Sequence, residues 1–489
     1  MSTEETTTDL KKKAVRGGAI SMAARLSTIM IQICSIVVLS RLLAPDDFGI
    51  IAMITAITAF MGLFRDMGLS AASIQKGELS DEHTNALFWL NVAAGGLLTL
   101  LTMASAPLIA WFYDRPELQP VTLLLATTFV ISSIGAQHSA LMQRELRFGP
   151  KVAGDVAGAL LTLVVSITLA LFDQGFWSLA WGTVLGAALT TLMYLKGSKF
   201  RPSMPKRTGG IRELLGFGAN VTAFELVNYF HRNLDSVLIG RVWGAESLGH
   251  YSRAYQMMML PISSLRAPIN AIAFPVLSRL QHNPAEFRTF YCRIASLLAF
   301  LSMPLMAFLI INSENVVSIA LGKQWIAVAP IFALLGITGF IQPVASLRGL
   351  VLLSLGQTRL YLAWGIVNAA VVSVAFLIGV SWGPTGVALA YAIANYLILY
   401  PSLVYFFRET PLRPLDFFSS IAIPLTATIV AAIGAFISTQ YLVMTASNWI
   451  QLGSSAAVFL ALFLVAVLLL PGGKKTLKDY YTMLRMIKK

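Results

Sequence analysis

The sequence predicts an all-helical, multi-pass membrane protein with about 14 transmembrane helices, and three observations support this fold class. Of the 489 residues, 56% are hydrophobic and only 12% are charged, whereas soluble domains carry about 25% charged residues. Apolar stretches of about 20 residues, long enough to cross a bilayer as a helix, recur along the chain. The net charge of +13 comes from Lys and Arg in alternate loops, which is typical of membrane proteins and predicts no nucleic-acid partner.

Fourteen stretches are expected to span the membrane, separated by turn or charge signals such as Gly149-Pro150 and Gly383-Pro384. They are residues 16–40, 48–74, 85–111, 119–140, 152–172, 177–195, 214–240, 249–276, 290–311, 325–353, 361–380, 385–407, 417–437 and 449–471. Twelve spans stay open as the alternative, because one pair of adjacent stretches could be a single span.

The basic residues predict the orientation. With the N-terminus inside, the external loops hold only Arg41, Arg115, Arg241 and Lys323, whereas most other Lys and Arg lie in internal loops and tails. We therefore expect both termini in the cytoplasm. The polar start has no cleavage site and is interpreted as a retained tail. Both cysteines, Cys34 and Cys292, are expected to be reduced.

Two stripes of polar residues interrupt the apolar pattern, one in each half of the chain. The first comprises Ser21, Arg25, Thr28, Gln32 and Ser35, and the second comprises Glu225, Asn228, Arg232 and Asp235. Steps of three or four residues place each set on one face of a helix. Charges in such segments face a bundle interior or a wet cavity, so the stripes predict two related walls around one charged cavity.

Matches at an offset of 200 support an internal repeat. Gly18 matches Gly218, Ala19 matches Ala219, Leu39 matches Ile239, Arg41 matches Arg241 and Gly49 matches Gly249. Six spans per half give a parallel repeat with a pseudo-two-fold axis along the membrane normal. The predicted organisation is a tail (1–15), an N-lobe (16–195), a basic linker (196–213), a C-lobe (214–407), two further spans (408–471) and a basic tail (472–489).

Seven charged residues are expected deep in the membrane: Arg25, Arg65, Asp66, Glu225, Arg232, Asp235 and Arg266. Each costs at least ~2.5 kcal/mol there. The alternative to a cavity is structural pairing, Glu225 with Arg232 or Arg65 with Asp66. For Arg253, Asp155 and Arg348, nearer the span ends, snorkelling or structural pairing is favoured. Because arginines outnumber acids in the deep set, the cavity suits an anion, and guanidinium binds phosphate well.

Other function classes are less well supported. Asp46-Asp47 is similar to the acidic pair of membrane glycosyltransferases, but capping of the next helix explains it, and no external loop offers space for such chemistry. The five histidines show no metal-ligand spacing, and no phosphate-binding Gly-Lys-Ser/Thr loop is present. We expect no cofactor and a transporter driven by H⁺, Na⁺ or the membrane potential. The C-terminal residues predict either a basic amphipathic helix on the membrane or a solvated tail.

Several segments resemble one family of membrane proteins. They are LLAPDDFG (42–49), FRDMGLSAA (64–72), ALFWLNV (86–92), NLDSVLIGR (233–241), LGHYSRAYQ (248–256), LSRL (277–280) and WGPTGVA (382–388). Over residues 15 to 410 the chain resembles the Wzx-type polysaccharide exporters, near the colanic acid exporter branch. Their superfamily, termed multidrug/oligosaccharidyl-lipid/polysaccharide (MOP), also holds lipid II flippases and multidrug antiporters. The last two spans match only in hydrophobicity.

This resemblance implies a flippase of the bacterial inner membrane. Members move undecaprenyl-diphosphate-linked oligosaccharides to the periplasmic leaflet by alternating between inward- and outward-open shapes. In that picture Arg25, Arg232 and Arg266 face the cavity and hold the diphosphate or acidic sugars. The role of Arg65-Asp66 is not settled by the match. Because Glu225 replaces Arg25 in the repeat, the two walls differ in charge.

The sequence therefore predicts an exporter of lipid-linked repeat units for exopolysaccharide or lipopolysaccharide synthesis, and not an enzyme. Substrate binding is assigned to Arg25, Gln32, Asn228, Arg232 and Arg266, and coupling or gating to Glu225, Asp235, Arg65 and Asp66. Expected partners are the lipid-linked substrate, membrane lipids and a polysaccharide polymerase or export machinery, with the protein as a monomer. The alternatives are an ion-coupled multidrug or small-solute antiporter of the same fold and, less favoured, a membrane glycosyltransferase or polymerase.

Overall fold

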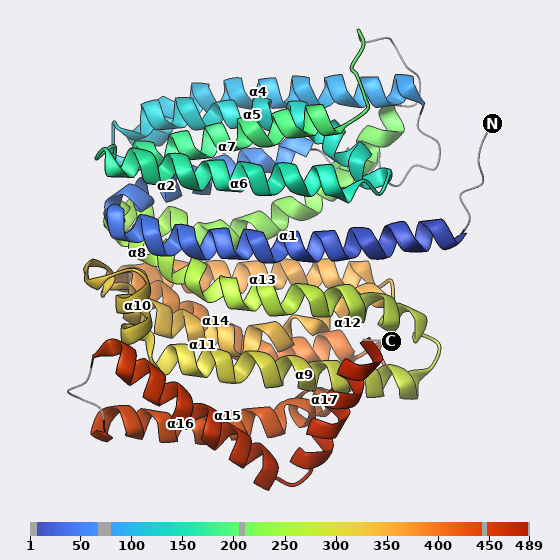
Figure 1. The fold of residues 1–489 in the computed structure, drawn as a ribbon, viewed down its shortest axis with the longest axis vertical. Coiled ribbons are helices and arrows are strands. Elements are labelled where there is room, and N and C mark those ends of the chain that lie inside the picture. The colour runs from blue at the N-terminus through green and yellow to red at the C-terminus, as the bar shows by residue number, and fades with distance from the viewer. Residues whose placement is uncertain (1–6, 67–79, 205–210, 443–446, 488–489) are drawn as a thin grey trace. The chain divides into compact units, whose positions relative to one another are not determined.

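The computed structural model describes residues 7–66, 80–204, 211–442 and 447–487, and side chains within 22–62, 80–204, 233–438 and 447–480. Over the described residues the chain is helical apart from turns and short connections, without strands (Figure 1). This confirms the predicted all-α class. The chain forms two compact units, Met1–Gly249 and His250–Lys489.

The first unit is built from long antiparallel helices. They are α1 (Thr7–Leu42), α2 (Pro45–Asp66), α4 (Asp81–Tyr113), α5 (Leu118–Arg144), α6 (Phe148–Leu171), α7 (Phe176–Gly197) and the first part of α8 (Ile211–Arg279). Here α4 packs against α5, α6 against α7, and α1 on α6. Its core includes Met53, Leu87 and Val121, all nearly inaccessible.

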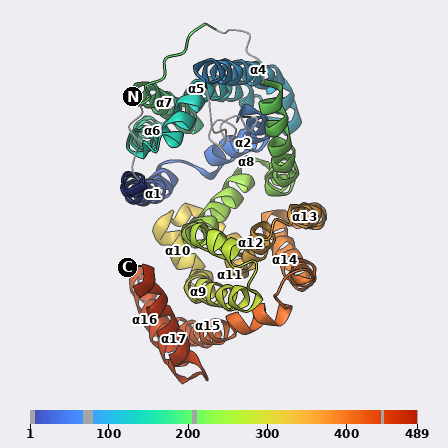
Figure 2. The same ribbon diagram turned by 90° about the vertical axis from the view of Figure 1, so that its right-hand side faces the viewer.

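The second unit continues from α8. It holds α9 (Pro284–Ile311), α10 (Ser313–Ala320), η1 (Lys323–Trp325), α11 (Val328–Ala345), α12 (Leu347–Ser354), α13 (Thr358–Gly379), η2 (Val380–Trp382), α14 (Gly383–Phe407), α15 (Pro414–Leu442), α16 (Asn448–Leu469) and α17 (Gly473–Ile487). In this unit α9 packs against α11 and α15, and α15 against α16. Figure 2 shows many helices of each unit nearly end-on.

Helix α8 runs from one unit into the other. Its 69 residues form two helical arms that meet at a kink, and each arm is long enough for one span of about 20 residues. Gly244 interrupts it with φ 80°, a backbone conformation that favours glycine. The two arms coincide with the predicted spans 214–240 and 249–276, so the prediction of two helices in this stretch is confirmed.

The fourteen predicted spans all fall on helices, and span 325–353 covers η1, α11 and α12. The end of predicted span 48–74 lies outside the described residues. Among the described residues, 12 stretches are long and apolar enough to cross a membrane. One of them, Thr358–Phe407, contains both α13 and α14, and the search did not cover the start of α8. The protein is therefore a multi-pass membrane protein.

The outer faces of the helices are apolar. On α15 and α16, Ile433, Phe436 and Leu460 are each more than half exposed, whereas Phe459, Phe463 and Ala431 on the same helices are buried. In a membrane protein, exposed leucine and isoleucine contact lipid tails. The two helices beyond the predicted repeat therefore present a lipid-facing side and pack on α9 by the other.

Candidate functional site

The predicted cavity face on α1 is exposed. Arg25 and Gln32 are both exposed, and Ser35 is partly exposed. The Thr28 hydroxyl donates within the helix to the carbonyl of Ala24 at 3.0 Å. Only 11% of the most hydrophobic stretch of α1 is buried, because α1 packs mainly on α6. From Arg25 to Ser35 the stripe is about 15 Å long, which provides an extended polar surface. The side chain of Ser21 lies outside the described residues.

Most of the second predicted face cannot be placed. Glu225, Asn228 and Arg232 lie in α8, and Arg65 and Asp66 end α2, but their side chains lie outside the described residues. Their roles in substrate binding, coupling or gating stay predictions.

Asp235 is the described member of the second stripe. It is only 4% exposed, and its Oδ1 accepts from the backbone N–H of Ser236 at 2.7 Å. A carboxylate withdrawn from water in a membrane helix costs free energy unless its oxygens are satisfied, so this contact accounts for part of its placement.

Arg266 lies in the second arm of α8, between Pro261 and Pro268, and is partly exposed. On the same arm the Ser263 hydroxyl donates to the carbonyl of Leu260 at 3.2 Å. The Asn270 Oδ1 is buried, and no hydrogen-bond partner for it occurs among the described residues. Arg266 and Asn270 therefore share a helix face that carries polar groups.

A close crossing of α2 and α8 is built from residues that the repeat relates. A Cβ on Gly49 would lie 1.8 Å from the carbonyl oxygen of Ala245, and a Cβ on Gly249 would lie 1.9 Å from that of Pro45. Pro45 and Ala245, like Gly49 and Gly249, are 200 positions apart. The contact is therefore reciprocal under the offset of the predicted repeat. Sequence analysis found the Gly49–Gly249 match but not that the two backbones touch.

The acidic pair after the first span has a structural role. Asp47 Oδ2 accepts from the backbone N–H of Ala44 at 3.0 Å, which is the backward half of a capping box at the start of α2. Asp46 forms an ion pair of 3.2 Å with Arg115, which also pairs with Glu117 at 2.9 Å. The prediction of helix capping is confirmed for Asp47.

The charges predicted to be structural have local contacts. Asp155 pairs with Lys151 at 3.0 Å and accepts from the Tyr194 hydroxyl. Arg253 donates to Gln256 Oε1 at 2.6 Å. The Arg348 guanidinium carbon lies 5.8 Å from the centroid of the Phe406 ring, a cation–π contact.

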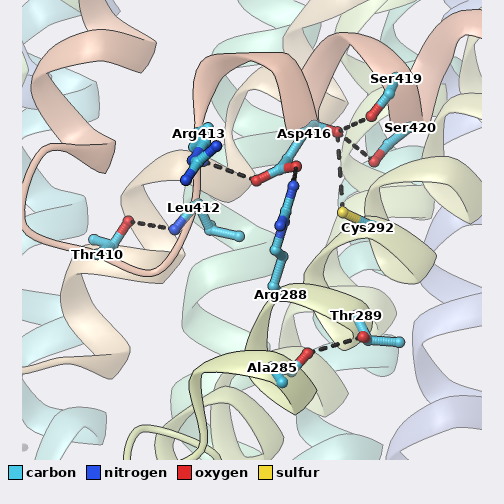
Figure 3. Close-up of polar contacts among 10 residues, drawn as sticks. All are labelled: Ala285, Arg288, Thr289, Cys292, Thr410, Leu412, Arg413, Asp416, Ser419 and Ser420. Atoms are coloured by element: carbon cyan, nitrogen blue, oxygen red, sulfur yellow. Dashed lines mark hydrogen bonds and ion pairs between the residues drawn. The ribbon is translucent and has the colours of Figure 1, made fainter.

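Sequence analysis missed a polar cluster that joins α9 to α15 (Figure 3). Asp416 is 4% exposed, and its Oδ1 accepts from Arg288 Nε at 2.9 Å and Nη2 at 2.5 Å. Its Oδ2 accepts from the backbone N–H of Arg413 at 2.8 Å, and its backbone oxygen accepts from the Ser420 hydroxyl at 2.6 Å. The cluster fastens the start of α15 to α9.

The described residues contain no candidate metal site. Among them, no group of three or more His, Cys, Asp or Glu could hold a metal ion. The features that do stand out are polar and charged faces on hydrophobic helices. This arrangement is that of a multi-pass membrane protein with charged groups in its spans.

The comparisons with known proteins agree with this class. Residues 38–330 match the family model described as "Polysaccharide biosynthesis protein", and the chain belongs to that family. It is 28% identical over 469 residues to the teichuronic acid biosynthesis protein TuaB of Bacillus subtilis, covering 93% of this chain and 96% of that one. It is 27% identical over 409 residues to the lipopolysaccharide biosynthesis protein WzxC of Escherichia coli, covering 82% of each. The predicted resemblance to Wzx-type proteins is confirmed.

Solved structures share the fold. The lipid II flippase MurJ in an inward closed conformation matches with a TM-score of 0.75 at 14% identity, covering 92% of this chain and 97% of that one. An inward-facing multidrug resistance transporter of the MATE family and MOP superfamily matches with a TM-score of 0.60 at 13% identity, covering 82% and 95%. The family and these neighbours are those of transporters, and not of enzymes.

Proposed function

We propose that this protein is a flippase that moves undecaprenyl-diphosphate-linked oligosaccharide repeat units across the bacterial inner membrane for exopolysaccharide or lipopolysaccharide synthesis. The observation that carries the proposal is the match to polysaccharide biosynthesis proteins over 82–93% of the chain combined with a fold shared with a lipid II flippase. Both termini are proposed to be cytoplasmic, since Lys and Arg gather in that set of loops.

The proposed transport path is a charged cavity with alternating access. The exposed Arg25 and Gln32 on α1 support a role for this face in holding the diphosphate, because a guanidinium fork matches phosphate oxygens. Arg232, Arg266 and Asn228 are proposed to complete the binding surface. Glu225, Asp235, Arg65 and Asp66 are proposed for coupling or gating, driven by H⁺, Na⁺ or the membrane potential. Membrane lipids and a polymerase or export machinery are proposed partners of a monomer.

A multidrug or small-solute antiporter is the alternative, because MATE transporters have the same fold. The two functions differ in the charge of the cargo. An organic cation would depend on Glu225 and Asp235 and tolerate loss of Arg25, whereas a lipid diphosphate requires a cation in the cavity.

Gene deletion and complementation test the proposal. In the deletion strain we expect polymer production to stop and lipid-linked repeat units to accumulate on the cytoplasmic leaflet, measured by their access to enzymes added to oriented vesicles. Arg25→Gln is expected to restore at most about a tenth of polymer output at normal expression, because a charge-assisted hydrogen bond contributes about 1.5–3 kcal/mol. Arg279→Gln, at the end of α8, serves as a charge-matched control.

Two results would contradict the proposal at different levels. Normal polymer in a deletion strain without a second copy of the gene would exclude the flippase function. If polymer production stops in the deletion strain but Arg25→Gln restores it fully, only the role of Arg25 is excluded.

A further inference from the structure

A buried aromatic residue of helix α17 contacts helix α9 within the second unit. Tyr480 is 6% exposed, its hydroxyl is hydrogen-bonded to Ser296 Oγ on α9 at 2.7 Å, and its ring centroid lies 5.0 Å from that of Phe300. Helix α17 begins at Gly473, shortly after the hydrophobic helix α16 ends, and its first turn contains Lys474 and Lys475. It therefore begins where the sequence changes from apolar to charged.

A pocket of about 210 Å³ lies between α17 and the two helices beside it. Cys292, Arg293 and Ser296 line it from α9, Ser419 and Ser420 from α15, and Thr476, Asp479 and Tyr480 from α17. This volume exceeds the space that one water molecule needs, so the pocket has room for a small polar group.

Most of the pocket wall is already hydrogen-bonded. The hydroxyls of Ser419 and Ser420 both donate to the backbone oxygen of Asp416, as Figure 3 shows. The Asp416 carboxylate is in turn bonded to Arg288. These contacts hold the side of the pocket formed by α15 in place. The charged side chains that line the pocket come from α9 and α17.

Two opposite charges remain on different walls. Arg293 on α9 and Asp479 on α17 both line the pocket, yet no salt bridge within 4.0 Å joins them among the described residues. A simple anion such as phosphate would be repelled by Asp479, and a simple cation would be repelled by Arg293. A ligand that carries both charges satisfies both walls.

We propose that this pocket binds a zwitterionic headgroup with a phosphate and a primary amine, the phosphate at Arg293 and the ammonium at Asp479. Phosphatidylethanolamine in the bilayer and soluble glycerophosphoethanolamine share this chemistry. The neighbouring end of α16 favours the lipid, because Leu468 and Leu469 are 47% and 79% exposed and offer an apolar surface for its chains. The site does not depend on the proposed cargo.

Lipid binding to the full-length protein in detergent, followed by native mass spectrometry, tests the proposal. The probes are phosphatidylethanolamine, phosphatidylglycerol and phosphatidylcholine. We expect phosphatidylethanolamine to bind about tenfold more tightly than the others, since phosphatidylglycerol lacks the ammonium and the quaternary amine of phosphatidylcholine has no N–H to donate to Asp479. Glycerophosphoethanolamine, added as a competitor, identifies the source: displacement at equal concentration indicates a soluble ligand, and resistance indicates the bilayer lipid.

Matched variants assign the preference to the pocket. Arg293→Gln and Asp479→Asn are each expected to weaken phosphatidylethanolamine binding about tenfold. Lys475→Gln on α17 and Glu286→Gln on α9 remove the same charges from exposed positions outside the pocket and should leave binding unchanged. If Arg293→Gln folds poorly, the isosteric Asp479→Asn decides alone. Equal affinity for the three lipids, or a preference that survives both pocket substitutions, would overturn the proposal.

Discussion

At the residue scale, Asp416 is a buried charged group of the second unit with a partner for each of its carboxylate oxygens. A nearly inaccessible carboxylate is tolerated because two N–H groups of Arg288 and the backbone N–H of Arg413 donate to it. It lies in the first turn of α15, where the helix dipole also favours a negative charge. The cluster accounts for how helices outside the predicted repeat are held against α9.

Neutralising this carboxylate tests that role. Asp416→Asn is expected to destabilise the protein by about 1–3 kcal/mol, because Arg288 and the N–H of Arg413 lose a charged acceptor. Thermal unfolding in detergent measures the change. Glu409→Gln is the control, because Glu409 and Arg408 form an exposed pair that contributes little. Equal melting temperatures for Asp416→Asn and the wild type would contradict the role of the cluster.

Glu117 provides a test by pH. Its hydrogen bond with Arg115 lowers the pKa of Glu117 below the usual 4.5. A carboxyl with a lowered folded-state pKa stabilises the fold above its unfolded pKa, and this contribution disappears as the pH falls through the folded pKa. We expect Glu117→Gln to cost about 0.5 kcal/mol at pH 7 and nothing well below pH 4, measured as the difference in melting temperature from the wild type. A difference that persists in acid would exclude the ion pair as its cause.

At the scale of elements, the apolar stretches of the sequence predicted almost every helix. An apolar stretch that crosses lipid must satisfy its own backbone hydrogen bonds, and an α-helix does so. The short helix α10 was beyond this reasoning, because its eight residues are too few for a span. The two arms of α8, which meet at the kink at Gly244, were predicted as separate spans. For the C-terminal residues, predicted as an amphipathic helix on the membrane or a solvated tail, the structure has helix α17, and its place on the membrane stays a prediction.

The crossing of α2 and α8 gives a test of the repeat. Gly49→Ala and Gly249→Ala each place a methyl group against a backbone carbonyl, less than 2 Å away, which only a backbone shift can relieve. We expect each substitution to lower the free energy of unfolding by about 1–3 kcal/mol, as overpacking does. The two losses should be similar because the contact is reciprocal. Thermal unfolding and transport activity measure the effect.

Gly96→Ala is the control for this pair, because a Cβ there meets no atom within 4 Å and alanine favours a helix. It should leave stability unchanged or raise it slightly. Loss of stability in Gly96→Ala equal to that of the other two would mean that the crossing has no special role.

At the scale of the whole molecule, the sequence predicted the fold class and the family better than the site. The family rests on segments such as residues 42–49 and 233–241, and the family model and relatives confirm it. The site could be predicted only as stripes, because spacing shows which residues share a helix face but not what that face meets. Arg25 and Gln32 are exposed on α1, whereas the partners of Arg25 and Asp235 follow from tertiary packing that periodicity does not encode.

The central claim is that the protein moves a lipid-linked anionic saccharide. Transbilayer movement in proteoliposomes tests it most directly, with the purified protein and an undecaprenyl-diphosphate-linked repeat unit whose exposed sugar is modified by an enzyme added outside. We predict that the wild type makes the inner-leaflet pool accessible within minutes and that Arg25→Gln slows this at least about tenfold. Movement no faster than in protein-free liposomes, with the protein folded and an ion gradient applied, would contradict the account.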